Sequence, residues 1–147
     1  MPGIRIYDEI RTHAMSDDKK AIHVTLNEDN DPPVTFDKPV LELKHKKKYK
    51  VVWKQDDDSA DFDFATLVIA GETFTNPTDK KDPKSGGPLS NVNVDDDKIT
   101  LKDDVGDAKL DIPYTVNVTA NGKTYSSSSS TIKDAGGSAK IRNQAGN

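Results

Sequence analysis

Hydrophobic and polar residues alternate along much of this chain with a period of two, which is typical of β-strands that bury one face. The runs "AIHVTL", "PVLELK", "KITLK" and "IPYTVNVTA" follow this pattern, and "YKVVWK" and "FDFATLVIA" are rich in β-branched and aromatic residues. No ten-residue stretch carries an apolar stripe of helical period. The expected inward residues are Ile22, Val24, Leu26, Leu41, Leu43, Ile99, Leu101, Ile112, Tyr114, Val116 and Val118.

Turn signals separate these runs. Asn121-Gly122 stands between two strand-like segments, and Asn-Gly supplies the positive φ angles that a type I′ hairpin turn requires. "AGE" (70–72) is a second hairpin candidate. Residues 76–91 carry three prolines and two glycines, so a long loop without strand or helix is expected there. One short strand is expected around 139–142.

Short strands with turn-rich connections predict an all-β fold, an immunoglobulin-like antiparallel β-sandwich of about seven or eight strands. Trp53 is the only tryptophan and is expected in the core, and Tyr114 has the place of a corner tyrosine. The expected domain spans residues 15–143. Residues 1–14 differ in pattern and are interpreted as a leader, either a tag or an over-long start, and 144–147 as a frayed tail.

Composition narrows the function classes. The chain has 147 residues, a formal net charge of −4 and no cysteine, which excludes disulfides and thiolate chemistry. No basic patch is interleaved with aromatic residues, so nucleic-acid binding is not expected. No apolar run is long enough for a membrane span. The N-terminal segment has no apolar signal region, so a cytoplasmic location is expected, or a secreted or surface location if a signal was removed.

Acidic residues gather between the predicted strands, and Asp+Glu number 25. Aspartate favours turns because its side chain accepts hydrogen bonds from nearby backbone amides. If successive strands alternate in direction, loops 27–33, 55–61 and 76–97 and the Asn121-Gly122 turn meet at one end, and loops 45–47 and 103–111 meet at the other. The acidic residues at these ends either form solvated turns, which is the expected interpretation, or bind a hard divalent cation.

Two segments favour the hypothesis of a bound divalent cation. "NEDNDPPVTF" resembles the linker at the end of a cadherin repeat, and "DDDSADF" resembles the acidic DxD segment of that family. The resemblance implies calcium ligation by Asn27, Asp29, Asp31, Asp56 and Asp58. The chain as a whole is also similar to small uncharacterised bacterial β-sandwich proteins called the DP-EP family.

Other candidate chemistry is sparse. His23 and His45 lack the spacing of a paired metal site, and the serine run 126–130 lacks a nucleophile elbow. "HKKKYK" (45–50) could bind an anionic surface, but a solvated hairpin rim is the expected interpretation. Paired carboxylates could hydrolyse glycosides, although few aromatic residues are available to line a cleft.

The sequence therefore predicts a protein that is not an enzyme and that has no cofactor, with calcium as the one candidate. Its function is predicted as a binding or interaction module for an unknown protein or carbohydrate ligand, using loops at one end of the sandwich. The alternative is a calcium-stabilised structural or adhesion domain, and a third hypothesis is a carboxylate-dependent hydrolase.

Overall fold

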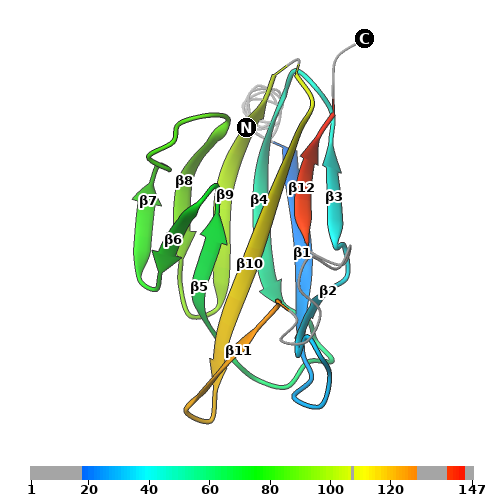
Figure 1. Ribbon diagram of the computed structural model, residues 1–147, viewed down its shortest axis with the longest axis vertical. Helices are drawn as coiled ribbons and strands as arrows, with labels where there is room; N and C mark the ends of the chain where they lie inside the picture. Colours follow the sequence, from blue (N-terminus) through cyan, green and yellow to red (C-terminus); the bar gives the residue numbers. More distant parts are fainter. Residues whose placement is uncertain (1–17, 107, 129–138, 145–147) are drawn as a thin grey trace, which may run out of the picture.

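A computed structural model describes residues 18–106, 108–128 and 139–144, and these residues form strands and turns without a helix (Figure 1). The all-β prediction is therefore confirmed, with more strands than expected. The strands are β1 (Asp18–Leu26), β2 (Val34–Phe36), β3 (Val40–Leu43), β4 (Lys47–Gln55), β5 (Asp63–Ile69), β6 (Glu72–Thr75), β7 (Thr78–Lys81), β8 (Leu89–Val94), β9 (Lys98–Val105), β10 (Leu110–Ala120), β11 (Lys123–Ser126) and β12 (Lys140–Asn143).

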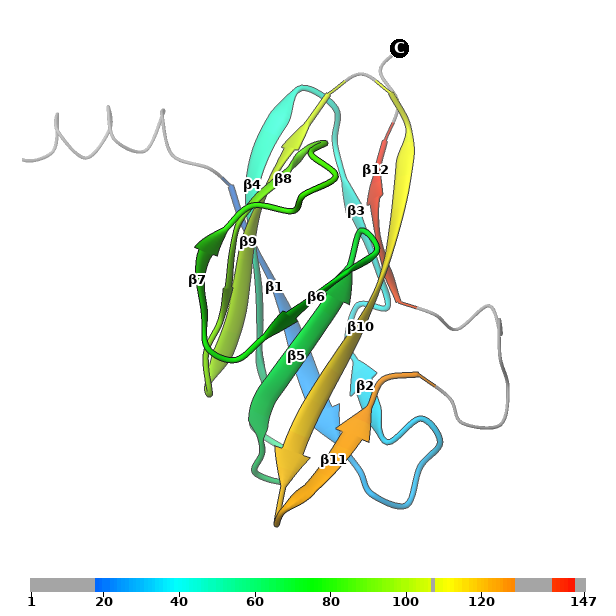
Figure 2. The same cartoon turned by 60° about the vertical axis from the view of Figure 1, so that its left-hand side comes forward.

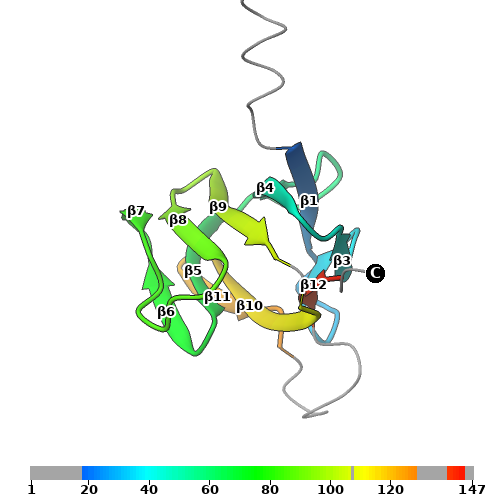
Figure 3. The ribbon, with the colours of Figure 1, turned by 90° about the horizontal axis from the view of Figure 1, so that it is seen from above.

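Two mixed sheets face one another in a sandwich-like arrangement, which Figure 3 shows from above. The first sheet has the order β2-β1-β4-β9-β8-β7. The second has the order β3-β12-β10-β5-β6, and β11 also pairs with β10. The edge strands of the first sheet are a three-residue strand and the Lys-containing β7, two features that discourage edge-to-edge aggregation.

The expectation of a purely antiparallel sandwich is wrong. β1 pairs with β4 in parallel, and β3 pairs with β12 in parallel. The cause is the segment 34–43, which pairs with β1 as β2 and then crosses to the other sheet as β3. Because this segment crosses the molecule in one direction, β4 returns in the direction of β1 and can lie directly beside it.

The core lies between the sheets, and every expected inward residue is buried in it. Trp53 of β4 is fully buried, as predicted. The Trp53 and Tyr114 rings pack edge to face, with ring centroids 5.1 Å apart. The Tyr114 and Phe36 rings pack in the same way, with centroids 5.4 Å apart. Three aromatic rings from β4, β10 and β2 thus connect the two sheets, and such edge-to-face pairs are favourable.

The expectation of a strand-free loop over 76–91 is wrong, because β7 and the first part of β8 lie within it. Its prolines fall outside the strands: Pro77 precedes β7, Pro83 follows it, and Pro88 precedes β8. A proline just beyond a strand removes no hydrogen bond from the ladder. Proline content therefore marked the ends of these strands, while the segment between them still paired.

The expected loop 103–111 is also shorter than predicted. β9 continues to Val105 and β10 begins at Leu110. Alternation through "KITLKDDV" places Asp103 on the inner face with Ile99 and Leu101, and Asp103 is fully buried. Asp103 therefore follows the alternation of its strand and not the preference of aspartate for turns.

Both predicted hairpin turns are confirmed. Asn121 and Gly122 have φ angles of 53° and 76°, and they join β10 to β11. Ala70 and Gly71 have φ angles of 54° and 73°, and they join β5 to β6. The short C-terminal strand is found as β12, one residue later than expected.

Some expectations concern residues that are not described. The leader 1–14 lies outside the described residues, as do 145–147 of the expected frayed tail. Gln144, the first residue of that tail, donates a backbone hydrogen bond to the Leu43 carbonyl at 2.9 Å. Within the described ranges, no helix is long and apolar enough to cross a membrane.

Candidate functional site

The acidic loops converge at one end of the molecule, called here the acidic pole and formed by loops 27–33 and 56–62 and turns 95–97 and 121–122 (Figure 2). β1 and β4 end together because they are parallel, and Asp56 donates its backbone N–H to the Val24 carbonyl at 2.8 Å. The start of β9 lies opposite the end of β4, and the start of β5 lies opposite the end of β10. The predicted meeting of loops 27–33 and 55–61 and the Asn121-Gly122 turn is confirmed. Of the predicted loop 76–97, only the turn 95–97 lies at this pole, because β7 and β8 carry the segment between them to the opposite end.

Three of the five predicted calcium ligands come together. Asn27, Asp29 and Asp58, from two loops, line an open hollow of about 490 Å³. Asp31 and Asp56 are not among the residues that line it. The loops 27–33 and 56–62 therefore meet, but they bring only part of the predicted ligand set to one place.

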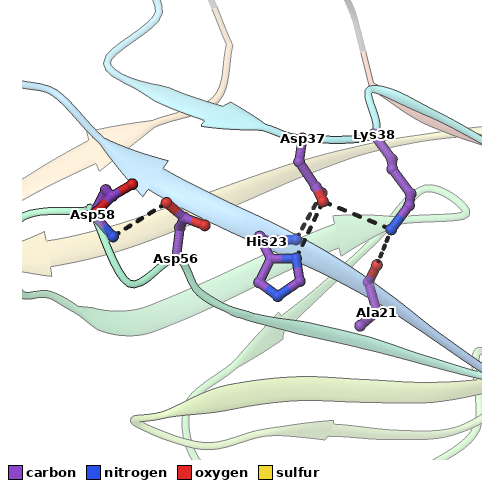
Figure 4. Close-up of polar contacts among 6 residues, drawn as sticks. All are labelled: Ala21, His23, Asp37, Lys38, Asp56 and Asp58. Carbon is purple, nitrogen blue, oxygen red and sulfur yellow. Dashed lines mark hydrogen bonds and ion pairs between the residues drawn. The ribbon is translucent and has the colours of Figure 1, made fainter.

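Two of these side chains already accept hydrogen bonds within their own loops. The Asn27 side-chain oxygen accepts the backbone N–H of Asp29 at 3.1 Å. An Asp56 carboxylate oxygen accepts the backbone N–H of Asp58 at 3.2 Å (Figure 4). Both are Asx turns, the ordinary use of Asn and Asp between strands. Across the described part of the chain, no group of three or more His, Asp or Glu side chains is placed to hold a metal ion.

A second, larger hollow opens beside the first at the same pole. It encloses about 610 Å³ and lies between the end of β4, the start of β5 and the β10–β11 turn. Asp61, Asp63 and Asn121 supply polar groups to its lining, and Phe62 supplies an aromatic ring. The Gln55 side chain donates to the Asp61 carboxylate at 3.1 Å. This hydrogen bond fixes the loop that forms one wall of the hollow.

Contacts with the sheets hold the loops of the acidic pole in place. The backbone N–H of Leu26 donates to the Ser59 hydroxyl at 2.9 Å, which joins β1 to loop 56–62. Tyr125 of β11 donates its hydroxyl to the Glu28 carboxylate of loop 27–33. This hydrogen bond to Glu28 raises the pKa of the Tyr125 phenol. Both loops therefore have fixed positions relative to the hollows that they line.

The structure also reveals a polar cluster that the sequence analysis missed. The Asp37 carboxylate accepts the backbone N–H of His23 at 2.8 Å and lies 3.1 Å from its ring Nδ1 (Figure 4). Lys38 lies 3.6 Å from the same carboxylate and donates to the Ala21 carbonyl at 2.9 Å. Burial opposes ionisation of Asp37, but the hydrogen bonds from His23 and the charge of Lys38 outweigh it and lower the pKa of Asp37.

This cluster has a structural explanation. β2 lies antiparallel to β1, and Asp37 directly follows β2, so its carboxylate reaches the backbone of β1 where the pairing ends. The His23 carbonyl in turn accepts the backbone N–H of Asp37 at 3.0 Å. The contacts close the end of a three-residue strand. The only signal in the sequence was an Asp directly after a short apolar run, a common arrangement at strand ends.

Comparison with known proteins gives no relative: no protein-family model, curated protein or solved structure matches this chain.

Proposed function

We propose that this chain is a non-enzymatic binding module with an immunoglobulin-like sandwich, which uses the loops of the acidic pole to hold a partner. The observation that carries the proposal is the pair of adjacent hollows at this pole, bordered by loops that are hydrogen-bonded to the sheets. Binding residues are often presented on loops that a rigid scaffold positions. The closely packed sheets beneath these loops are such a scaffold.

The lining of the larger hollow indicates the kind of ligand. Carboxylates of Asp61 and Asp63 accept hydrogen bonds or attract cations, and the Phe62 ring offers an apolar edge. A basic protein segment or a hydroxyl-rich carbohydrate has the complementary groups. Catalysis is not part of the proposal, because the Asp56 carboxylate and the Asn27 side chain already accept backbone hydrogen bonds that shape the loops.

The proposal can be tested with Asp61→Asn combined with Asp63→Asn. Binding of a panel of lysine-rich peptides and neutral oligosaccharides would be followed by NMR chemical-shift changes in the full chain. We expect shifts centred on residues 55–63 and 119–122, and we expect the double variant to lose them. The control, Asp18→Asn with Asp104→Asn, makes the same charge change at the opposite end. An equal loss in the control would contradict a specific site at the acidic pole.

A calcium-stabilised structural or adhesion domain is the second candidate. It rests on Asn27, Asp29 and Asp58, which come from two different loops and line one hollow. Calcium accepts carboxylate and amide oxygens in flexible geometry, so these groups have the chemistry of a calcium site. The measurement that separates this candidate from solvated turns is the dependence of the melting temperature on calcium.

A further inference from the structure

The outer face of the first sheet is strongly basic. On β4 the buried residues Tyr49, Val51 and Trp53 alternate with outward positions, and on β9 Ile99 and Leu101 do the same. The outward positions of these two strands and of the neighbouring β1 carry most of the lysines there. The basic face consists of Lys19, Lys48, Lys50, Lys54, Lys98 and Lys102, and at its edge Lys48 lies opposite the carboxylate of Asp104.

Several of these lysines are direct neighbours across strands. Lys50 lies opposite Lys102, and Lys54 lies opposite Lys98. On the other side of β4, Lys19 lies opposite Lys50. Like charges that face one another across a sheet are destabilising, and a carboxylate in either place would stabilise the strand pair. Repeated like-charge pairs on a well-packed sheet indicate a surface that is shaped for an anionic partner.

The lysines form two rows across the sheet. Between them lies a row of shorter side chains, called here the low row. One row runs through Lys19, Lys50 and Lys102, and the other through Lys54 and Lys98. The low row between them contains Val52 and Thr100, which are 5% and 7% exposed. Lys50 and Lys54 are four residues apart in one strand, so the rows are separated by about 13 Å.

The low row ends in a hollow at β8 and β7. It encloses about 360 Å³ and is lined by Lys50, Lys80, Asn91, Asn93, Thr100, Leu101 and Lys102. This hollow is built by hydrogen bonds: the Asn93 side chain accepts the backbone N–H of Lys80 at 2.8 Å and donates to the Thr100 hydroxyl at 3.2 Å. Lys80 and Asn91 both have positive φ angles, where the pairing of β7 and β8 and of β8 and β9 shifts register.

We propose that this face binds a linear anionic polysaccharide, with its carboxylate or sulfate groups between the two lysine rows. The low row runs across β1, β4, β9 and β8, a length of about 14 Å at the usual strand spacing. Ammonium groups on both sides would neutralise the charges of a single extended chain.

The shape of the face argues against other polyanions. The outward positions between the lysines are Ala21, His23, Val52 and Thr100, so no Phe, Tyr or Trp lies there for stacking single-stranded nucleic acid. A duplex major groove about 12 Å wide admits a helix or a two-stranded ribbon, not the face of a broad sheet. A flat bilayer would meet the tips of the lysines and leave the low row between them unused.

The test is a binding measurement by isothermal titration calorimetry on the full chain. The probes are a sulfated and a uronic-acid oligosaccharide, neutral dextran, single-stranded and duplex DNA, and vesicles that contain phosphatidylserine. The test variant is Lys50→Gln with Lys54→Gln. The control is Lys84→Gln with Lys123→Gln, which removes the same charge from exposed positions off the face.

We expect at least one of the two anionic oligosaccharides to bind and dextran not to bind. The affinity for the anionic oligosaccharide should fall as the salt concentration rises. The test variant should weaken binding by about tenfold or more, and the control by about twofold or less. Equal losses in the two variants would overturn the proposal, because attraction would then depend on total charge. Tighter binding of DNA or vesicles than of both oligosaccharides, or no binding to any anionic probe, would overturn it as well.

Discussion

At the scale of single residues, Trp53 has the largest predicted effect on stability. It is fully buried, and its ring packs on the Tyr114 ring of the opposite sheet with ring centroids 5.1 Å apart. Trp53→Ala would leave a cavity between the sheets, and the expected loss in unfolding free energy is about 3–5 kcal/mol. Trp53→Phe is the control, because it keeps a ring at the same place and should lose clearly less. Chemical denaturation of both variants measures the difference.

The fluorescence of the native protein gives an independent check. A buried indole emits at short wavelength and is protected from iodide. A red-shifted emission that iodide quenches readily would contradict the burial of Trp53 and the strand register that produces it.

A buried polar pair joins the two sheets at the end opposite the acidic pole. Asn143 of β12 donates its side-chain N–H to the Asp103 carboxylate of β9 at 3.0 Å. The other Asp103 oxygen and the Asn143 oxygen are buried, and neither has a hydrogen-bond partner within the described residues. A proton on the free Asp103 oxygen could be donated to the Asn143 oxygen, and every polar group of the pair would then have a partner.

Burial raises the pKa of Asp103 to about 6, with the adjacent Asp104 adding to the shift and the Asn143 hydrogen bond opposing it. The folded state therefore binds this proton more tightly than the unfolded state does. The contribution of Asp103 to the unfolding free energy is most favourable below pH 4, and it declines as the pH rises from about 4 to 6. Above that range the charged carboxylate destabilises the fold.

Asp103→Asn should remove this dependence, because its amide can donate to Asn143 at any pH. We expect the variant to exceed the original protein in stability at pH 8, by about 1–3 kcal/mol, and to lose this advantage near pH 4. Urea denaturation across this pH range measures the difference. Asp104→Asn is the control: Asp104 points outward opposite Lys48 and adds only the smaller part of the shift, so a clearly smaller gain is expected. A constant difference at all pH values would contradict the raised pKa of Asp103.

At the scale of elements, the β4–β9 ladder carries a testable electrostatic cost. Lys54→Glu would place a carboxylate opposite Lys98 and beside His23 of β1. The expected gain in unfolding free energy is about 0.2–1 kcal/mol, and it should shrink in concentrated salt. The melting temperature at low and high salt measures it. Lys84→Glu, away from the ladder, should give no comparable gain, and an equal gain would mean that total charge decides the effect.

The strands that could be predicted are those in which alternation is complete. Ile22, Val24 and Leu26 in β1 and Ile112 through Val118 in β10 bury one face at every second position, so the sequence identified both the strands and their inward residues. β7 could not be found in this way, since "TDKK" has no buried residue and forms a strand only by pairing with β8. Pairing between distant segments, as in the parallel β3–β12 pair, leaves no local pattern in the sequence.

The site was predictable to a similar degree. Alternating strand directions were enough to bring loops 27–33 and 56–62 together, although the sheets are mixed. Which carboxylates share one hollow depends on loop conformation, and Asp31 and Asp56 are not part of its lining. The basic face is not predicted by the sequence, because "HKKKYK" favours a solvated hairpin rim. In the structure Lys50 lies in β4, opposite Lys19 of β1 and Lys102 of β9.

At the scale of the whole molecule, charge is separated although the formal net charge is only −4. The acidic pole carries Glu28, Asp29, Asp31, Asp56, Asp57, Asp58, Asp61, Asp95, Asp96 and Asp97. The lysines of the basic face cover the outside of the first sheet. A cation or a basic partner at the pole and a polyanion on the sheet would therefore occupy different surfaces, and the two could bind at the same time.

The response of the whole fold to calcium tests whether the acidic pole is only a set of solvated turns. Asp56 and Asn27 already satisfy backbone amides in Asx turns, so we expect calcium and sodium chloride of matched ionic strength to raise the melting temperature by similar amounts. A specific ion at 100 times its dissociation constant would instead add about 2.7 kcal/mol to the unfolding free energy. Magnesium should give less than calcium at such a site, because it dehydrates reluctantly and requires stricter geometry.

Melting temperatures in EDTA, in millimolar calcium, in magnesium and in matched salt distinguish these outcomes. A calcium-specific rise of several degrees would contradict the expectation and support the calcium-stabilised domain. Asp29→Asn with Asp58→Asn, which changes the two carboxylates that share the hollow, would then have to abolish the rise. Asp31→Asn with Asp56→Asn makes the same charge change at predicted ligands outside that hollow and serves as its control. If only the control pair abolished the rise, the ion would lie away from the hollow, because charge alone would affect both pairs equally.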